Sequence, residues 1–382
     1  MTAMRKERID ELDVLRGMAM LSVILQHALG VYIRRPEIHF ADAAMIGMLF
    51  NITKFAVPTF VFVTGAALLY NYYDNLDYPK FLWKRIKDIL LPYLVWSIAY
   101  EIYSNGLLEA NFLWLRNLGK DLLYGNAFYH LWFVVMTFQF YLVYPAFRSL
   151  FRKAPAILDS KPRFVTAVGL LAALYTLIMW FSYSYIPSVN LHAGLKAVQV
   201  IFIELRDRNF IYFFFYFILG GIAGLLMPRW REFVTKSPIW NTYLFAGLFI
   251  WIGFELMQGV SGGQVNLNYS TSLKPSMFYY TVSEIVFLYG LSLVIVESRS
   301  CIYKLFNLAG KYSYGIYLAH AFVLVYAVRL VDKFSPLAHH LPASIYAFIL
   351  CSLGTIVVVL LLSKIPGAKF VLGPLPGQVK KS

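Results

Sequence analysis

The chain alternates between long apolar segments and short polar ones. Ten apolar segments are each about as long as the roughly 20 helical residues that cross a bilayer. They are residues 14–33, 43–70, 86–104, 129–147, 163–182, 209–227, 240–258, 278–296, 313–331 and 343–363. This pattern predicts an all-α integral membrane protein with about ten transmembrane helices. The second segment is the longest and contains Pro58, which predicts a kink there.

Composition supports a membrane protein. Of the 382 residues, 59% are apolar and 14% are charged, whereas soluble domains have about 25% charged residues. We therefore expect residues 1–382 to form one transmembrane domain without an appended soluble domain. The charged start leads directly into a full-length apolar segment, which predicts an uncleaved signal anchor. Cys301 and Cys351 are placed too differently to pair, and no spacing is typical of metal ligands, so no metal is expected.

The distribution of Lys and Arg predicts the orientation. If the N-terminus is cytoplasmic, the inner segments carry 23 basic residues and the outer loops carry 10. Because basic residues concentrate on the cytoplasmic side, both termini should be cytoplasmic. The formal net charge of +14 is explained by this asymmetry and by anionic lipid headgroups, so nucleic-acid binding need not be invoked.

Arg16 and His27 form the strongest functional signal. Eleven residues are almost three helical turns, so both side chains should lie on one face of the first helix, about 16 Å apart along its axis. Ionisable groups within a bilayer are costly and usually face a protein-lined cavity. We therefore expect this face to line a site, with Asp13 holding the Arg16 side chain at a spacing of three residues.

Other polar side chains within the predicted spans favour the outer half of the membrane. They predict an outward-opening, water-accessible cavity in which a neutral imidazole can act as a general base. Buried histidines also hydrogen-bond neighbouring helices, the simpler interpretation for His320, while His130 fits either role. Trp132 also fits an interfacial aromatic belt. The candidate cavity residues are Lys54, Glu101, His130, Trp132, Glu255, Glu284, Tyr317 and His320.

A basic cluster precedes the third span. Lys84, Arg85 and Lys87 fit the ordinary enrichment of basic residues on the cytoplasmic side. Alternatively, they form an anion site at a helix start, where the phosphates of a cytoplasmic cofactor could dock.

Several short motifs, in this order, resemble the acyltransferase 3 family. They are Asp13-x-Leu15-Arg16-Gly17 with His27, the Phe60–Gly65 stretch, the basic step into Leu91-Pro92-Tyr93, His130-Leu131-Trp132-Phe133, and Tyr312–His320. The resemblance covers essentially the whole chain and is nearest to the Gram-positive branch, which includes the protein of biofilm poly-N-acetylglucosamine loci. It implies a multi-pass O-acyltransferase of the bacterial cell membrane that modifies cell-surface glycans.

The resemblance implies acyl-CoA, most simply acetyl-CoA, as the cytoplasmic donor and a hydroxyl of an extracytoplasmic polysaccharide as the acceptor. It also implies that Arg16 and His27 are the functional pair. The family's R-x-x-R motif before the third span is replaced here by Lys84-Arg85-Ile86-Lys87, which keeps the positive charge but weakens bidentate phosphate recognition.

The mechanism can also be argued from the residues alone. A sugar hydroxyl needs a base and a donor for the developing oxyanion. His27 is the candidate base or acyl carrier, so direct transfer and an acyl-histidine relay both stay open. A carboxylate among Glu101, Glu255 and Glu284 is expected to orient it. The candidate oxyanion donors are Lys54, Tyr317 and His130.

A transporter or flippase for a glycan or small solute is the main alternative, because polar residues near the midplane and a Pro-containing span suit it as well. No inverted repeat relates the first and last five spans, which favours the enzyme. The acyl group, the sugar and the oligomeric state are not specified by the sequence.

Overall fold

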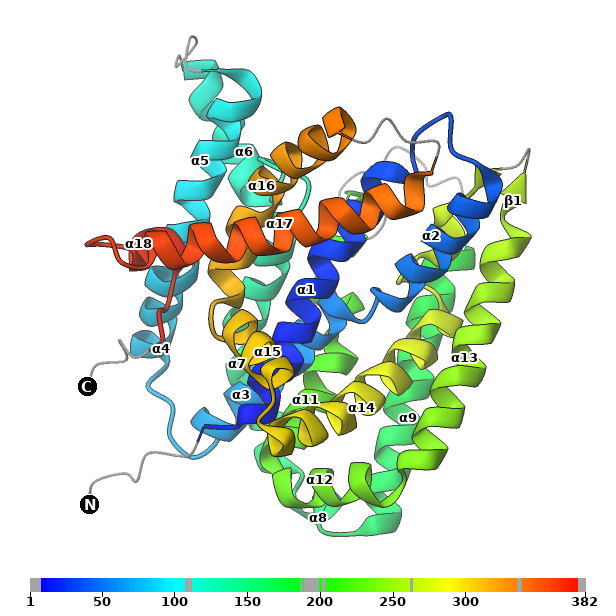
Figure 1. The fold of residues 1–382 in the computed structure, drawn as a ribbon. Helices are drawn as coiled ribbons and strands as arrows, with labels where there is room; N and C mark the ends of the chain where they lie inside the picture. The colour runs from blue at the N-terminus through cyan, green and yellow to red at the C-terminus, as the bar shows by residue number, and fades with distance from the viewer. Residues whose placement is uncertain are drawn as a thin grey trace.

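A computed structural model describes residues 8–106, 112–185, 188, 199–200, 204–261, 264–334 and 339–376, and these are almost entirely helical. Figure 1 shows helix α1 in the middle of the bundle, with α13 and α9 along one side and α17 crossing in front. The two short strands pair antiparallel, with Val260 opposite Val265. The predicted all-α class is therefore confirmed.

The elements follow one another with few long loops. The first half of the chain contains α1 Asp10–Tyr32, α2 Phe40–Ile52, α3 Ala56–Tyr72, α4 Tyr78–Arg85, the π-helix η1 Ile86–Leu90, α5 Leu91–Asn105, α6 Phe112–Tyr124, α7 Trp132–Lys153, α8 Pro155–Leu158, α9 Lys161–Trp180 and the π-helix η2 Phe181–Tyr185. The second half contains the 3₁₀ turns η6 Arg206–Arg208 and η7 Phe210–Tyr212, α11 Phe214–Leu225, α12 Met227–Lys236, α13 Pro238–Gln258, β1 Val260–Ser261, β2 Gln264–Val265, the 3₁₀ turn η8 Leu267–Ser270, α14 Pro275–Ser298, α15 Cys301–Lys311, α16 Ser313–Phe334, α17 His340–Leu362 and α18 Lys369–Leu372.

Each of the ten predicted spans falls on a helical segment, but they are not equally suited to cross a membrane. By length and composition, seven stretches of the described chain could cross one, and they are Asp10–Tyr32, Phe40–Tyr72, Lys161–Tyr185, Pro238–Gln258, Pro275–Ser298, Ser313–Phe334 and His340–Leu362. The sixth predicted span contains the 12-residue helix α11, about 18 Å long, which alone is shorter than the roughly 30 Å hydrocarbon core. The count of ten and the cytoplasmic termini therefore stay predictions.

The second predicted span is interrupted just ahead of Pro58. Residues 53–55 form turns between α2 and α3, and the backbone N–H of Lys54 bonds the carbonyl of Asn51 at 3.1 Å. Pro58 lies in the first turn of α3, where its missing N–H costs little. The interruption therefore agrees with the kink predicted for this span, since Pro58 cannot donate to the carbonyl of Lys54 four residues earlier, and Lys54 lies in the break itself.

Glycines let two helix pairs approach closely. A Cβ on Gly65 of α3 would lie 2.1 Å from the carbonyl oxygen of Phe217 in α11, and one on Gly17 of α1 would lie 2.0 Å from that of Phe306 in α15. Only glycine permits backbones at that separation, as in other membrane bundles. The backbones of α1 and α3 are therefore held in place next to the residues that form the site.

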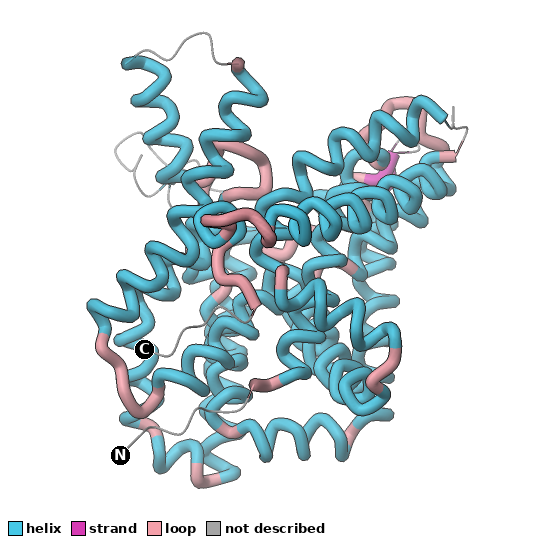
Figure 2. The backbone as a smooth tube through the Cα atoms, turned by 60° about the vertical axis from the view of Figure 1, so that its left-hand side comes forward, coloured by secondary structure: helices cyan, strands magenta, loops and turns pink. Residues whose placement is uncertain are grey.

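Helices α5 and α6 form the most prominent projection of the molecule. In both views they extend beyond the rest of the helices (Figures 1 and 2). Elsewhere, α9 and α13 expose large apolar side chains, such as Leu170 at 68% and Ile250 at 70%. Such surfaces suit contact with lipid rather than water.

Candidate functional site

Helix α1 contributes to two cavities. Arg16 lines a smaller cavity of about 240 Å³, and His27 lines a larger one of about 830 Å³. Both residues lie within the continuous helix Asp10–Tyr32, so the predicted shared face is present. Because eleven residues separate them, Arg16 and His27 lie at different levels along α1, about 16 Å apart.

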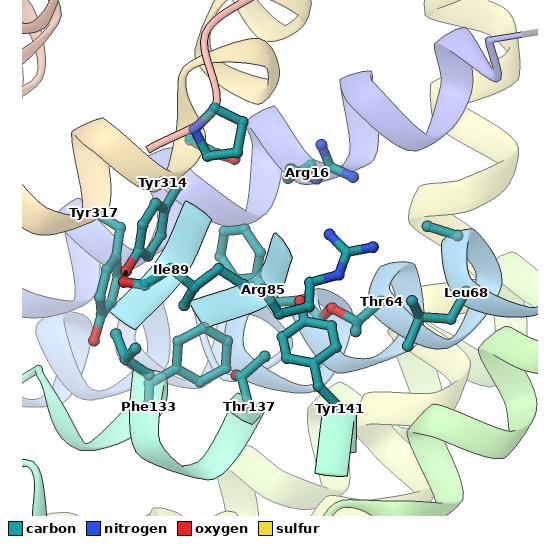
Figure 3. A pocket seen from close by; sticks show the side chains of 15 residues that line it. Arg16, Thr64, Leu68, Arg85, Ile89, Phe133, Thr137, Tyr141, Tyr314 and Tyr317 are labelled. Carbon is teal, nitrogen blue, oxygen red and sulfur yellow. Dashed lines mark hydrogen bonds between the residues drawn. The ribbon is translucent and has the colours of Figure 1, made fainter. Parts of the chain in front are cut away.

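The smaller cavity combines two guanidinium groups with hydroxyl side chains. Arg85 is the last residue of α4 and directly precedes the π-helix η1, a type of distortion found frequently at functional sites. Figure 3 shows the Arg85 guanidinium pointing toward Arg16. The other polar groups at its wall are Thr64, Thr137, Tyr141, Ser313 and Tyr314.

Arg16 is held from its own helix. Its Nη1 lies 3.4 Å from Oδ1 of Asp13, whose other oxygen pairs with Arg8. The Arg16 side chain is 31% exposed. Asp13 thus contacts Arg16 as the spacing predicts, and it leaves part of the guanidinium directed at the cavity.

Arg85 is held by aromatic rings. Its guanidinium carbon lies 5.0 Å from the ring centre of Phe81 and 5.1 Å from that of Tyr141. Among the residues that the structure describes, its buried Nε has no hydrogen-bond partner. Two guanidiniums that face each other repel, and an anion between them would relieve this and receive charge-assisted hydrogen bonds.

Lys84 and Lys87 do not join this pair. Both side chains are exposed, and neither lines the cavity. Lys87 instead places its ammonium 4.8 Å from the ring centre of Trp83. Of the predicted basic cluster, the structure therefore brings only Arg85 to Arg16.

The larger cavity has a histidine cluster at its wall. The ring of His27 is stacked on that of His320 at 5.3 Å between centres, and His130 lies 4.9 Å from His320. The three predicted histidines, from three separate parts of the chain, are thus brought together. His27 and His130 line the cavity, while His320 is fully buried behind them.

Backbone and ring contacts fix this cluster. Nδ1 of His320 lies 2.6 Å from the carbonyl oxygen of Tyr317, and the Tyr317 hydroxyl donates to the carbonyl oxygen of His130. The ring of Tyr129 meets His27 edge-on at 4.8 Å. His130 is only 2% exposed, so its imidazole is almost entirely enclosed at the wall of the cavity.

The carboxylates at the larger cavity differ from those predicted. Among the described residues, Glu204 and Asp207 line it, and burial raises the pKa of the Asp207 carboxyl. Glu101, Glu255 and Glu284 do not. Glu101 accepts a hydrogen bond from Asn105 at 2.7 Å, Glu255 pairs with Lys274 at 2.6 Å, and Glu284 is buried within α14. The expectation that one of these three orients His27 has no support in this arrangement.

Three basic residues also line the larger cavity, and they are Arg34, Lys54 and Arg206. Trp132 lies at the wall as well. Arg34 was missed from the sequence because it lies in the turn just beyond the end of α1, where its guanidinium donates to the carbonyl oxygen of Gly30 at 2.5 Å. Glu204 and Asp207 come from an irregular segment that carries no periodic signal.

The two cavities share three aromatic residues. Phe60, Phe133 and Tyr317 line both, and the Phe133 ring centre lies 5.7 Å from that of Phe60 and 5.6 Å from that of Tyr317. Rings at these separations are in contact. These three residues, which we call the aromatic partition, stand between the Arg16 cavity and the His27 cavity. Figure 3 shows Phe133 and Tyr317 at one end of the Arg16 cavity.

Comparison with known families identifies the chain. The model of an acyltransferase domain, Acyl_transf_3, matches residues 9–364. The chain belongs to the acyltransferase 3 family. The predicted resemblance is therefore confirmed, and the protein is a multi-pass membrane acyltransferase.

Two curated relatives cover most of the chain. The "Putative membrane-bound acyltransferase YfiQ" of Bacillus subtilis (strain 168) is 22% identical over 353 residues, which are 91% of this chain and 90% of the relative. The "Probable poly-beta-1,6-N-acetyl-D-glucosamine export protein" of Staphylococcus aureus (strain MW2) is 22% identical over 325 residues, 84% of this chain and 83% of the relative. No solved structure matches the chain.

Proposed function

We propose that this acyltransferase moves an acyl group, most simply acetyl, from cytoplasmic acyl-CoA to a hydroxyl of a glycan on the outer side of the bacterial cytoplasmic membrane. The observation that carries the proposal is the pair of cavities at different levels of α1, one with Arg16 and Arg85 and the other with His27. An enzyme that joins substrates from opposite sides of a membrane needs two such openings that meet.

The Arg16 cavity suits the donor. Coenzyme A carries several phosphates, and guanidinium groups bind phosphate through two parallel hydrogen bonds. Arg16 and Arg85 present partly unpaired guanidiniums toward one space. Arg85 supplies the planar fork that the neighbouring lysines lack. Acyl-CoA is therefore the donor that best fits this end of the molecule.

The His27 cavity suits a glycan acceptor. Its volume of about 830 Å³ is within the usual range of ligand pockets. Its wall contains acidic, basic, amide and hydroxyl side chains together with Trp132 and Tyr129. This mixture offers hydrogen bonds and ring faces to a sugar. The staphylococcal relative is named for a poly-N-acetylglucosamine, which makes an amino-sugar polymer a reasonable first acceptor to test.

His27 is proposed as the general base. It takes the proton of the acceptor hydroxyl as the oxygen attacks the thioester carbonyl carbon. The new C–O bond forms, the C–S bond breaks, and the leaving thiolate receives the proton from the imidazolium. His320, stacked behind His27, positions the ring. Because the Tyr317 hydroxyl donates to a backbone carbonyl, His130 and Lys54 are the better oxyanion donors of the three predicted ones.

The test uses purified protein in proteoliposomes with radiolabelled acetyl-CoA and oligomers of β-1,6-linked N-acetylglucosamine. Label on the sugar is the expected product. His27→Ala should lower the rate by about 10²- to 10⁴-fold, the usual contribution of general acid–base catalysis. His39→Ala, which changes an exposed histidine ahead of α2, is the matched control and should retain the wild-type rate.

Two results would contradict the proposal. A folded His27→Ala protein with near-normal transfer would remove His27 as the base. Movement of the oligomer across the bilayer without any label on the sugar would favour the transporter instead. A labelled His27 adduct that forms without acceptor and disappears when acceptor is added would identify the acyl-histidine relay.

A further inference from the structure

The aromatic partition lies between the two cavities that the proposed function assigns to the donor and the acceptor. Phe60 comes from α3, Phe133 from the first turn of α7, and Tyr317 from α16, so three separate helices meet here. The three side chains line both cavities, and their rings are in contact. A group that travels from the Arg16 side to His27 therefore displaces one of these rings.

The backbone around the partition cannot easily make room. Helix α3 is locked against α11, because Gly65 and Gly220 bring the two backbones together and a Cβ on Gly220 would lie 1.9 Å from the carbonyl oxygen of Phe62. On the opposite side, the hydroxyl of Tyr317 is held by the backbone of His130. Phe60 and Phe133 are the members that can rotate, and neither ring is fully buried.

We propose that the aromatic partition selects short acyl groups, with Phe60 and Phe133 as the specificity-determining residues. This inference rests on the proposed function, because it assumes an acyl-CoA donor on the Arg16 side. Rotation of one ring opens a space suited to a small acyl group and its thioester. Each further methylene must push the two rings further aside. The rings rest against helices that are held in place, and moving these helices apart costs energy.

The expected rate difference between short and long acyl donors follows from how strongly pockets discriminate chain length. One methylene that does not fit changes the rate by about 10- to 200-fold. Butyryl-CoA, with two methylenes more than acetyl-CoA, should therefore react at no more than about 1% of the acetyl rate. Removing the Phe133 ring should raise the butyryl-to-acetyl rate ratio by at least about tenfold, because the lost ring makes room for those methylenes.

The experiment measures CoA thiol release and sugar acylation with acetyl-, butyryl- and hexanoyl-CoA in proteoliposomes. Wild type is compared with Phe133→Ala and with the milder Phe133→Leu and Phe60→Leu, which keep the test possible if the alanine variant does not fold. Phe147→Ala is the matched control. Phe147 is a partly buried phenylalanine of the same helix that lines neither cavity. Its chain-length profile should equal that of wild type.

The expected result is a shift of the Phe133 and Phe60 variants toward longer donors. A second expected sign is faster thiol release without acceptor, because water gains a path between the cavities. If wild type uses acetyl-CoA but the variants keep its profile, the partition does not select the acyl group and this inference is wrong. If wild type turns over no acyl-CoA of any length, the proposed function itself fails and the inference fails with it.

Discussion

Arg85 should dominate donor binding among the basic residues ahead of the third predicted span. The Arg85→Gln variant keeps a polar side chain but removes the positive charge and the planar guanidinium group. Hydrogen bonds to charged groups contribute about 1.5–3 kcal/mol each. Loss of one phosphate contact should therefore raise the KM for acyl-CoA by roughly 10- to 150-fold. Arg85→Lys should lie between Arg85→Gln and wild type.

The neighbouring lysines are the matched controls. Lys84 and Lys87 are exposed and lie outside the cavity, so Lys84→Gln and Lys87→Gln should change KM by less than about threefold, because exposed charges contribute about 0–1 kcal/mol and are screened. The assay is the steady-state rate against acetyl-CoA concentration at saturating acceptor, with thermal unfolding measured on each variant. A larger KM effect from either lysine variant than from Arg85→Gln would refute the assignment of Arg85 to the donor.

Two further predictions concern stability and topology. Glu255→Ala removes the carboxylate that lies 2.6 Å from the ammonium of Lys274, whose side chain is only 4% exposed. The free energy of unfolding should therefore fall by about 3–5 kcal/mol. Glu232→Ala breaks an exposed ion pair and should leave the free energy of unfolding nearly unchanged in the same denaturation assay. Cys301 is exposed and Cys351 is buried, so an impermeant maleimide should label the wild-type protein only in opened cells, and labelling of Cys301 in intact cells would contradict the predicted cytoplasmic loop.

The helices and the shared face of Arg16 and His27 on α1 could be predicted from the sequence, because both depend only on the spacing of nearby residues. Apolar runs predict helices, and a spacing of eleven residues fixes a shared face whatever surrounds it. The convergence of His27, His130 and His320 was only partly foreseen. Sequence analysis named His130 and His320 as candidate cavity residues and put His27 on a cavity-lining face, but the stacking of His27 on His320 depends on how α1 and α16 pack.

The carboxylates were not predictable in the same way. Glu101, Glu255 and Glu284 lie within predicted spans, but a position along a helix does not specify which face turns inward. Glu255 is occupied by Lys274, which the loop before α14 delivers. Glu204 and Asp207, by contrast, reach the cavity from an irregular segment. Tertiary packing, rather than periodicity, decides these positions.

The break at Lys54 shows how a local feature gains meaning only from packing. A helix that ends within the apolar region leaves carbonyl and N–H groups to be satisfied, which is tolerated where they are buried in protein or line a cavity. Here the turn bonds of residues 53–55 satisfy part of the backbone, and Lys54 projects into the His27 cavity with its ammonium 4.5 Å from the ring centre of Phe50. The interruption therefore places the Lys54 amine at the wall of the His27 cavity.

The close helix contacts and the aromatic partition fit the proposed transfer between two sides of a membrane. Gly17, beside Arg16, holds α1 against α15, and Gly65 holds α3 against α11, so the proposed donor and acceptor cavities are built on closely packed helices. Under the proposed function, rotation of Phe60 or Phe133 between these helices would let an acyl group pass. The same ring contacts would then also limit the access of water to the thioester.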